Sequence, residues 1–167
     1  MVLDAEVEIA GRNMQRRRVK LSDFYREDGR AHLALDADEI LVAVHLPPYP
    51  PPSSYGKARV RGAIDFPLAG VAVALTMDGE KLAALRVGIT GTNSRPFLLK
   101  GVDALFGRTL DADALHELET LVQKQVQPMR TTTISAHYRR LAAAALVRRL
   151  TTTLAFPPHA TGKKRQD

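Results

Sequence analysis

The chain has 167 residues, of which 45% are hydrophobic and 25% are charged. These values are typical of a folded globular chain with room for one domain, or one small domain plus part of another. Cysteine is absent, which excludes disulfides and cysteine-held iron–sulfur clusters within the chain. The net charge of +6 permits nucleic-acid binding, but the 5% of aromatic residues offers no stacking platform. A solvated surface or an acidic partner subunit accounts better for the charge.

The sequence shows no sign of a leader peptide or a membrane span. A basic segment followed by a long apolar run does not occur at the N-terminus. The longest apolar run, near residues 141–147, is too short to cross a bilayer. These patterns predict a cytoplasmic protein without membrane insertion.

Residues 5–21 predict a β-hairpin. Val7 and Ile9 alternate with glutamates, and Val19 and Leu21 alternate with basic residues across a turn at Gly11. A lone hairpin is marginal in water. We expect it to belong to a larger fold, with little in this chain to pack against.

A further strand and a proline-rich stretch follow. Ile40, Val42, Val44 and Leu46 alternate with the intervening residues, which predicts a strand that ends near residue 46. The stretch PPYPPPSS, residues 47–54, cannot continue a sheet, because proline has no amide hydrogen and a fixed φ. Polyproline II is expected there. A linker between domains is the favoured interpretation, and a ligand for a proline-recognition module is the alternative.

The remainder predicts an α+β domain. Alternating apolar residues at 71–77 and 85–89 flank a hairpin signal at Asp78 and Gly79. Helices are expected over residues 98–106, from a cap at Asp111 to Pro128, and from a start at Ser135. The predicted buried side of the last helix consists of Ala142, Ala145, Leu146, Leu150 and Leu154. The predicted fold is a three-stranded antiparallel sheet packed on a three-helix bundle.

No residue pattern predicts a catalytic or metal site within the chain. The five histidines lack the close helical spacing of a zinc pair, and no nucleophile elbow or phosphate-binding loop occurs. The segment 88–94 is interpreted mainly as a turn between strand and helix. The unusual stretch is 55–66, which places basic and aromatic residues together at a predicted domain boundary. It is either a ligand-binding edge or a solvated edge strand of alternating charge.

Several motifs in order resemble the medium, flavoprotein subunit of molybdenum hydroxylases. They are DEILV at 38–42, SYGKAR at 54–59, DFPLAGVAVAL at 65–75, RVGITGTNSRP at 86–96 and SAHYRR at 135–140. The group includes carbon monoxide dehydrogenase, xanthine dehydrogenase and 4-hydroxybenzoyl-CoA reductase. Each motif is loose alone, and their order and spacing carry the resemblance over nearly the whole chain. Only the C-terminal portion of such a subunit is matched.

The resemblance implies a role in an oxidoreductase complex that contains molybdenum, flavin and iron–sulfur clusters. The flavin subunit would pass electrons between FAD and iron–sulfur clusters. Molybdopterin would lie on a large partner subunit, and the clusters would lie on a small one. The glycine-rich loops that hold the flavin's phosphates belong to the N-terminal half of such subunits and do not occur here. The chain is therefore expected to be inactive when isolated, and to bind FAD only with upstream residues.

The resemblance also implies which residues lie near the flavin. Leu41 and Lys57 match family positions beside the flavin, and Phe66 matches an aromatic position if one residue is skipped. Tyr55 and Arg59 belong to the same segment as Lys57. In structural terms, residues 1–46 would be the end of an FAD-binding domain and 47–54 a linker. Residues 55–157 would form the C-terminal domain, and 158–167 a disordered basic tail.

The nearest variant is interpreted as the β subunit of 4-hydroxybenzoyl-CoA reductase. The segments YREDGRAHLAL at 25–35 and RVRGAIDFP at 59–67 favour it. The alternative hypothesis is a non-catalytic module that docks partner subunits and no longer binds flavin.

Overall fold

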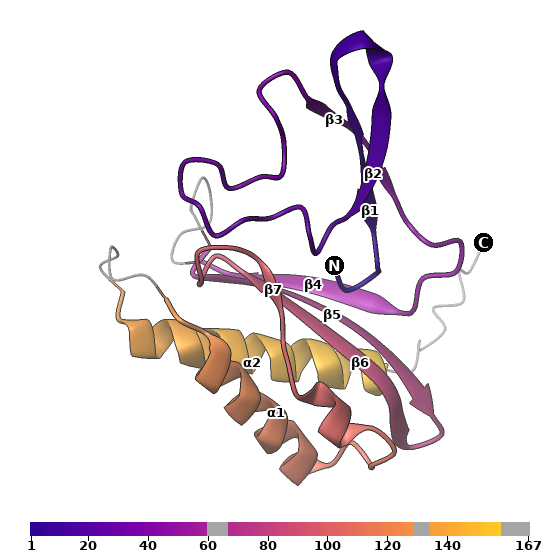
Figure 1. The fold of residues 1–167 in the computed structure, drawn as a ribbon. Helices are drawn as coiled ribbons and strands as arrows, with labels where there is room; N and C mark the ends of the chain where they lie inside the picture. Colours follow the sequence, from indigo (N-terminus) through magenta and orange to yellow (C-terminus); the bar gives the residue numbers. More distant parts are fainter. Residues whose placement is uncertain (60–66, 129–133, 158–167) are drawn as a thin grey trace, which may run out of the picture.

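The computed structural model describes residues 1–59, 67–128 and 134–157. These residues form two antiparallel sheets and two α-helices (Figure 1). The predicted α+β class is confirmed. The predicted basic tail at 158–167 lies outside the described residues.

The first sheet contains the predicted hairpin. In the order β2-β1-β3, its strands are β1 (Glu6–Ala10), β2 (Arg16–Lys20) and β3 (Ile40–His45). Val7 of β1 lies opposite Val19 of β2, so the alternation seen in the sequence does set the register. A short 3-10 helix, η1 (Arg12–Met14), forms the turn between them.

This sheet has a small hydrophobic cluster of its own. Val7, Ile9 and Phe24 are buried together, and half-buried side chains from residues 19–35 pack around them. The expectation that the hairpin has little in this chain to pack against was therefore wrong. The segment after β2 folds back over β1, which alternation within strands cannot reveal.

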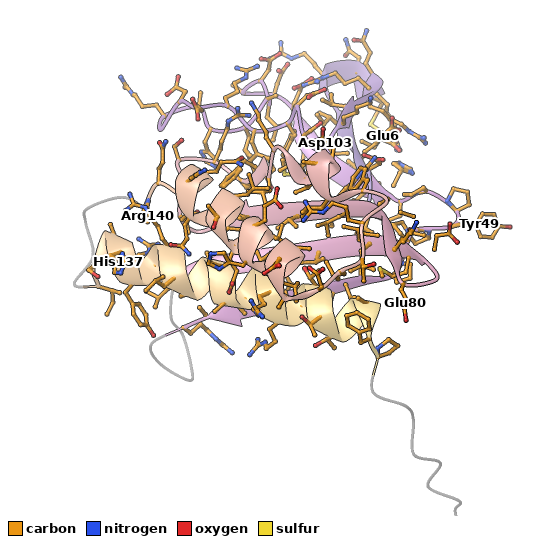
Figure 2. All side chains as sticks on the ribbon, turned by 90° about the horizontal axis from the view of Figure 1, so that it is seen from below. Glu6, Tyr49, Glu80, Asp103, His137 and Arg140 are labelled. Carbon is orange, nitrogen blue, oxygen red and sulfur yellow. The ribbon has the colours of Figure 1, made fainter. Side chains whose placement is uncertain are left out.

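The second sheet is larger and has four strands in place of the predicted three. In the order β4-β5-β6-β7, they are β4 (Ser53–Ala58), β5 (Ala69–Asp78), β6 (Lys81–Thr90) and β7 (Phe97–Leu98). The hairpin predicted at Asp78 and Gly79 joins β5 to β6, and Gly79 takes a φ of 58° there. β4 begins at Ser53, within the last residues of the proline-rich stretch. Tyr49, in that stretch, is 94% exposed and projects from the body of the molecule (Figure 2).

Two α-helices follow the sheet, together with one short 3-10 helix. They are η2 (Val102–Leu105), α1 (Ala112–Gln125) and α2 (Ala136–Ala155). The predicted caps are confirmed. The Ala114 amide donates to Asp111 Oδ1 at 2.9 Å, and the Tyr138 amide donates to Ser135 Oγ at 3.2 Å.

The prediction of a three-helix bundle was wrong for one of the three helices. The first residue of the expected helix 98–106, Leu98, instead pairs with β6 as the end of β7, and only 102–105 form a helical turn. Gly101, with a φ of 81°, separates the two. Strand pairing therefore prevails over the apolar spacing that favoured a helix.

The two helices cover one face of the second sheet, and the first sheet lies toward its other face (Figure 1). The main core lies between sheet and helices and includes Leu85, Leu118 and Val147, each at most 2% exposed. On α2, Leu146 and Leu150 are buried as predicted, whereas Ala145 is exposed. Asp4 pairs with Arg86, and Glu27 accepts a hydrogen bond from Ser94, so the two sheets are also joined by polar contacts.

Ion pairs hold the first sheet together at its surface. Arg17 Nε and Nη2 donate to the two carboxylate oxygens of Glu39 at 2.8 and 2.6 Å. These bonds, with the amide of Asp36, lower the pKa of Glu39 from 4.5 to about 2. Hydrogen bonds from Arg16 and then His45 likewise lower the pKa of Glu8.

The Glu39 pair predicts a specific pH dependence. Because its pKa is depressed in the folded state, its stabilisation is fully present above pH 4.5 and is lost as the pH falls toward about 2. We expect wild type to be more stable than Glu39→Gln at pH 6, with the difference shrinking below pH 4.5. Urea denaturation at several pH values measures it. A difference that stays constant down to pH 2.5 would contradict the assignment.

Candidate functional site

The predicted flavin segment lies on β4, and the strand directs its side chains to two faces. Tyr55 and Lys57 are two residues apart and so share a face, which is largely exposed. Gly56, between them, faces α2, and a Cβ there would lie 3.2 Å from Leu146 Cδ2. Tyr55 and Lys57 therefore point away from the helices, toward the side on which the first sheet lies.

Small residues on neighbouring strands leave this face open. Tyr55 lies opposite Ala72, which in turn lies opposite Gly88. Lys57 lies opposite Gly70. A Cβ on Gly70 would lie 3.0 Å from the Tyr55 hydroxyl oxygen and 2.8 Å from a Thr90 methyl carbon. Glycine at position 70 therefore makes room for the Tyr55 ring.

A cation and an aromatic ring meet at this place. Lys57 Nζ lies 5.8 Å from the centroid of the Tyr55 ring, within cation–π range. Both side chains are mostly exposed, so the contact orients them without burying the charge.

A pocket of about 250 Å³ opens beside Tyr55, between the two sheets. Its floor is Gly70, Ala72 and Gly88, and two tyrosines, Tyr25 and Tyr55, contribute to its walls. The other lining residues are Met1, Val2, Leu21, Ile89, Thr90 and Pro96. The lining is mainly apolar, and its floor carries only glycine and alanine, which suits the edge of a planar ring better than a charged group.

The structure brings only part of the predicted site together. Tyr55 and Lys57 are adjacent, and Arg59 is exposed directly after β4. Leu41 lies on β3 in the other sheet, is 38% exposed and does not line the pocket. Phe66 lies outside the described residues.

Sequence reasoning missed Tyr25 and Gly70. Tyr25 approaches the second sheet only because the segment after β2 folds back, and nothing in its local pattern predicts that approach. Gly70 had a signal, since glycine inside a strand marks a close approach.

Other kinds of site are not found in the described parts of the chain. No group of three or more His, Asp or Glu residues among them is placed to hold a metal ion. Across residues 1–59, 67–128 and 134–157, no helix is both long enough and apolar enough to cross a bilayer. His45, the only histidine on a described strand, bonds to Glu8, with Nε2 and Oε2 2.6 Å apart.

The fold is shared with chains of solved CO dehydrogenase and quinoline 2-oxidoreductase structures. A chain of Cu,Mo-CO dehydrogenase in a cyanide-inactivated form superposes with a TM-score of 0.81 at 28% identity, covering 92% of this chain and 54% of that one. Reconstituted CO dehydrogenase from Oligotropha carboxidovorans gives the same values. A chain of quinoline 2-oxidoreductase from Pseudomonas putida 86, 24% identical with a TM-score of 0.81, shows the fold alone.

Curated sequences agree with the structural match. The carbon monoxide dehydrogenase medium chain of Afipia carboxidovorans is 29% identical over 133 residues, which is 78% of this chain and 46% of the relative. The glyceraldehyde dehydrogenase medium chain of Sulfolobus acidocaldarius is 26% identical over 125 residues, 74% of this chain and 44% of the relative. The chain thus spans about half the length of the curated relatives it matches.

The family is shown by the part of the chain that contains the second sheet and the helices. The CO dehydrogenase flavoprotein C-terminal domain matches residues 53–154, more than half of the chain. The chain belongs to this family.

Proposed function

We propose that the chain forms one wall of the flavin site in the FAD-carrying subunit of a molybdenum-flavin-iron–sulfur oxidoreductase. The observation that carries the proposal is the pair Tyr55 and Lys57, which lie on an open sheet face beside a mainly apolar pocket. The flavoprotein family to which the chain belongs supports the same assignment. FAD, when bound, would carry electrons to and from iron–sulfur clusters of a partner subunit.

The residues present fit a flavin ring but not its phosphates. The pocket floor of Gly70, Ala72 and Gly88 would admit the edge of a flat ring, and the absence of a Cβ at Gly70 leaves room for Tyr55. Lys57 would place a positive charge beside the ring and stabilise its reduced form, and Arg59 would add to the same field. The phosphates would be held by residues of the upstream half, as the glycine-rich loops are absent from this sequence.

The remaining site residues would contribute from other elements. Leu41 would contact the flavin from β3, and Phe66 would lie near the ring system. Residues 1–46 would then belong to the flavin-binding domain, with 47–54 as linker and 55–157 as the C-terminal domain. A large molybdopterin-binding subunit and a small iron–sulfur subunit would be the partners, in the cytoplasm.

A 4-hydroxybenzoyl-CoA reductase complex is the proposed setting. The segments at 25–35 and 59–67 support this choice. Co-expression with the large and small subunits of such a reductase, followed by assay of 4-hydroxybenzoyl-CoA reduction, tests it. Assembly without activity on that substrate would redirect the proposal to another molybdenum hydroxylase.

The flavin role gives a direct prediction. FAD fluorescence should change little on titration with the chain alone, and should be quenched stoichiometrically once the upstream half of a medium chain is supplied. Lys57→Met should weaken FAD binding in that complex by about tenfold, the effect of about 1.4 kcal/mol. It should also make the flavin reduction potential more negative, since a positive charge is lost.

Lys81→Met is the matched control, because Lys81 is exposed at the far end of β6. It should leave both affinity and potential unchanged. A complex that assembles without binding FAD would favour the non-catalytic docking module instead.

A further inference from the structure

β3 is an edge strand with one side unpaired. It pairs with β1 along one edge, in the order β2-β1-β3. In the part of the chain that the structure describes, no strand pairs with its other edge. A row of backbone amides and carbonyls therefore remains available to another polypeptide.

The two edges of this sheet differ in their protection. β2, the opposite edge, has the sequence RRRVK, with four basic residues in five. Charges of this kind discourage pairing with other chains. β3 has the sequence ILVAVH and contains no Lys, Arg, Asp or Glu. Only the edge at β3 is therefore suited to accept a partner strand.

One face of β3 is also left uncovered. Residues directly opposite in antiparallel strands share a face. Val44 lies opposite Val7, and Leu41 lies opposite Ile9. Val7 and Ile9 are fully buried, but Val44 is 56% and Leu41 is 38% exposed.

The apolar side chains that pack on this face of the first sheet thus bury β1 but leave β3 exposed. The half-buried apolar side chains that pack on Val7 and Ile9 come from residues 19–35. A register shift at β3 adds Val42, which is 44% exposed and has no partner on β1. On the polar face of the strand, His45 bonds to Glu8 instead. Ile40, opposite Ala10 on that same face, is 64% exposed as well.

We propose that β3 is the docking strand for the polypeptide equivalent to the upstream half of the medium chains. That polypeptide would add a strand to the free edge of β3 and cover Leu41, Val42 and Val44 with apolar side chains. This inference rests on the proposed function, since it names the partner of the same subunit.

The occupant is inferred from the part of the relatives' length that this chain does not match. The chain matches 46% and 44% of the two curated medium chains. The matched family domain is described as C-terminal, so most of the unmatched length precedes it. A segment of that size is sufficient to extend a three-stranded sheet and to cover an apolar strand.

The test uses the unmatched N-terminal part of the Afipia carboxidovorans medium chain as the probe. Titration calorimetry and light scattering should show a one-to-one complex with this chain. Val44→Lys should weaken it about 30-fold or more, because a lysine would be buried at the centre of the contact. Val44 is exposed in the free chain, so the variant should fold, which circular dichroism verifies.

Leu141→Lys is the matched control. Leu141 lies on α2, is 41% exposed, and would gain the same charge far from β3. It should bind the probe as wild type does. Equal binding by Val44→Lys, or no complex with the probe, would overturn the proposal. A third result would also overturn it: a dimer of this chain alone that Val44→Lys converts to a monomer. The strand on β3 would then come from a second copy of the chain.

The two proposals fail in different ways. A complex that depends on Val44 but binds no FAD would support the docking role of β3 and contradict the flavin role. FAD binding that depends on Lys57 but not on Val44 would support the flavin role and contradict the docking role of β3.

Discussion

Arg139→Met is expected to lower the free energy of unfolding by about 3 kcal/mol, because a charged donor and its buried acceptors are separated. Arg139 is 5% exposed. Its Nε donates to the Leu68 carbonyl at 3.0 Å, and Nη2 donates to the Gly91 carbonyl. The guanidinium thereby ties α2 to the start of β5 and the end of β6. Methionine would fill much of the space but leave both carbonyls without a donor.

Two further variants isolate the cause. Arg139→Lys keeps the charge, yet a single ammonium group lacks the fork that reaches both carbonyls, so it should recover only part of the loss. Arg149→Met on the same helix removes an exposed guanidinium and should change stability by no more than about 0.5 kcal/mol. Guanidinium chloride denaturation followed by circular dichroism measures all three. Equal stability of Arg139→Met and wild type would show that the carbonyls find other donors.

Leu118→Ala is expected to have an effect of similar size, about 3 kcal/mol, for a different reason. Leu118 is fully buried on α1 and belongs to the main core. The substitution removes apolar contact and leaves a cavity between helix and sheet that can only partly close. The midpoint of urea denaturation should fall while its slope is unchanged.

An exposed leucine supplies the comparison for this variant. Leu141→Ala, at a position 41% exposed, should cost less than about 1 kcal/mol. If both substitutions cost the same, α1 does not pack as described. A slope that falls in Leu118→Ala alone would indicate that the variant loses two-state unfolding.

The elements with strong local signals could be predicted from the sequence. Asp111 and Ser135 cap their helices as expected, and Asp78 with Gly79 forms the turn of the β5–β6 hairpin. In each case the residue acts on backbone within a few positions of itself, so a few neighbouring residues determine the outcome. Tyr55 and Lys57 share a face for the same local reason.

Features that depend on distant partners could not be predicted. The alanine-rich run in α2 offers little contrast between faces, so the exposure of Ala145 is set by how the helix sits on the sheet. The register shift in β3 places Leu41, not Val42, opposite Ile9, which strict alternation does not foresee. The wall formed by Tyr25 exists only once the two sheets face each other.

The unequal size of the two hydrophobic clusters has a consequence for motion. Twenty-one buried residues form the cluster under the second sheet, whereas three form the cluster of the first sheet, among the residues described. Local opening costs less where fewer buried contacts must separate. Amide hydrogens of β1 and β3 should therefore exchange with solvent at a lower free energy than those of β5 and β6. Strand addition at β3 would slow that exchange, so binding and local ordering would occur as one event.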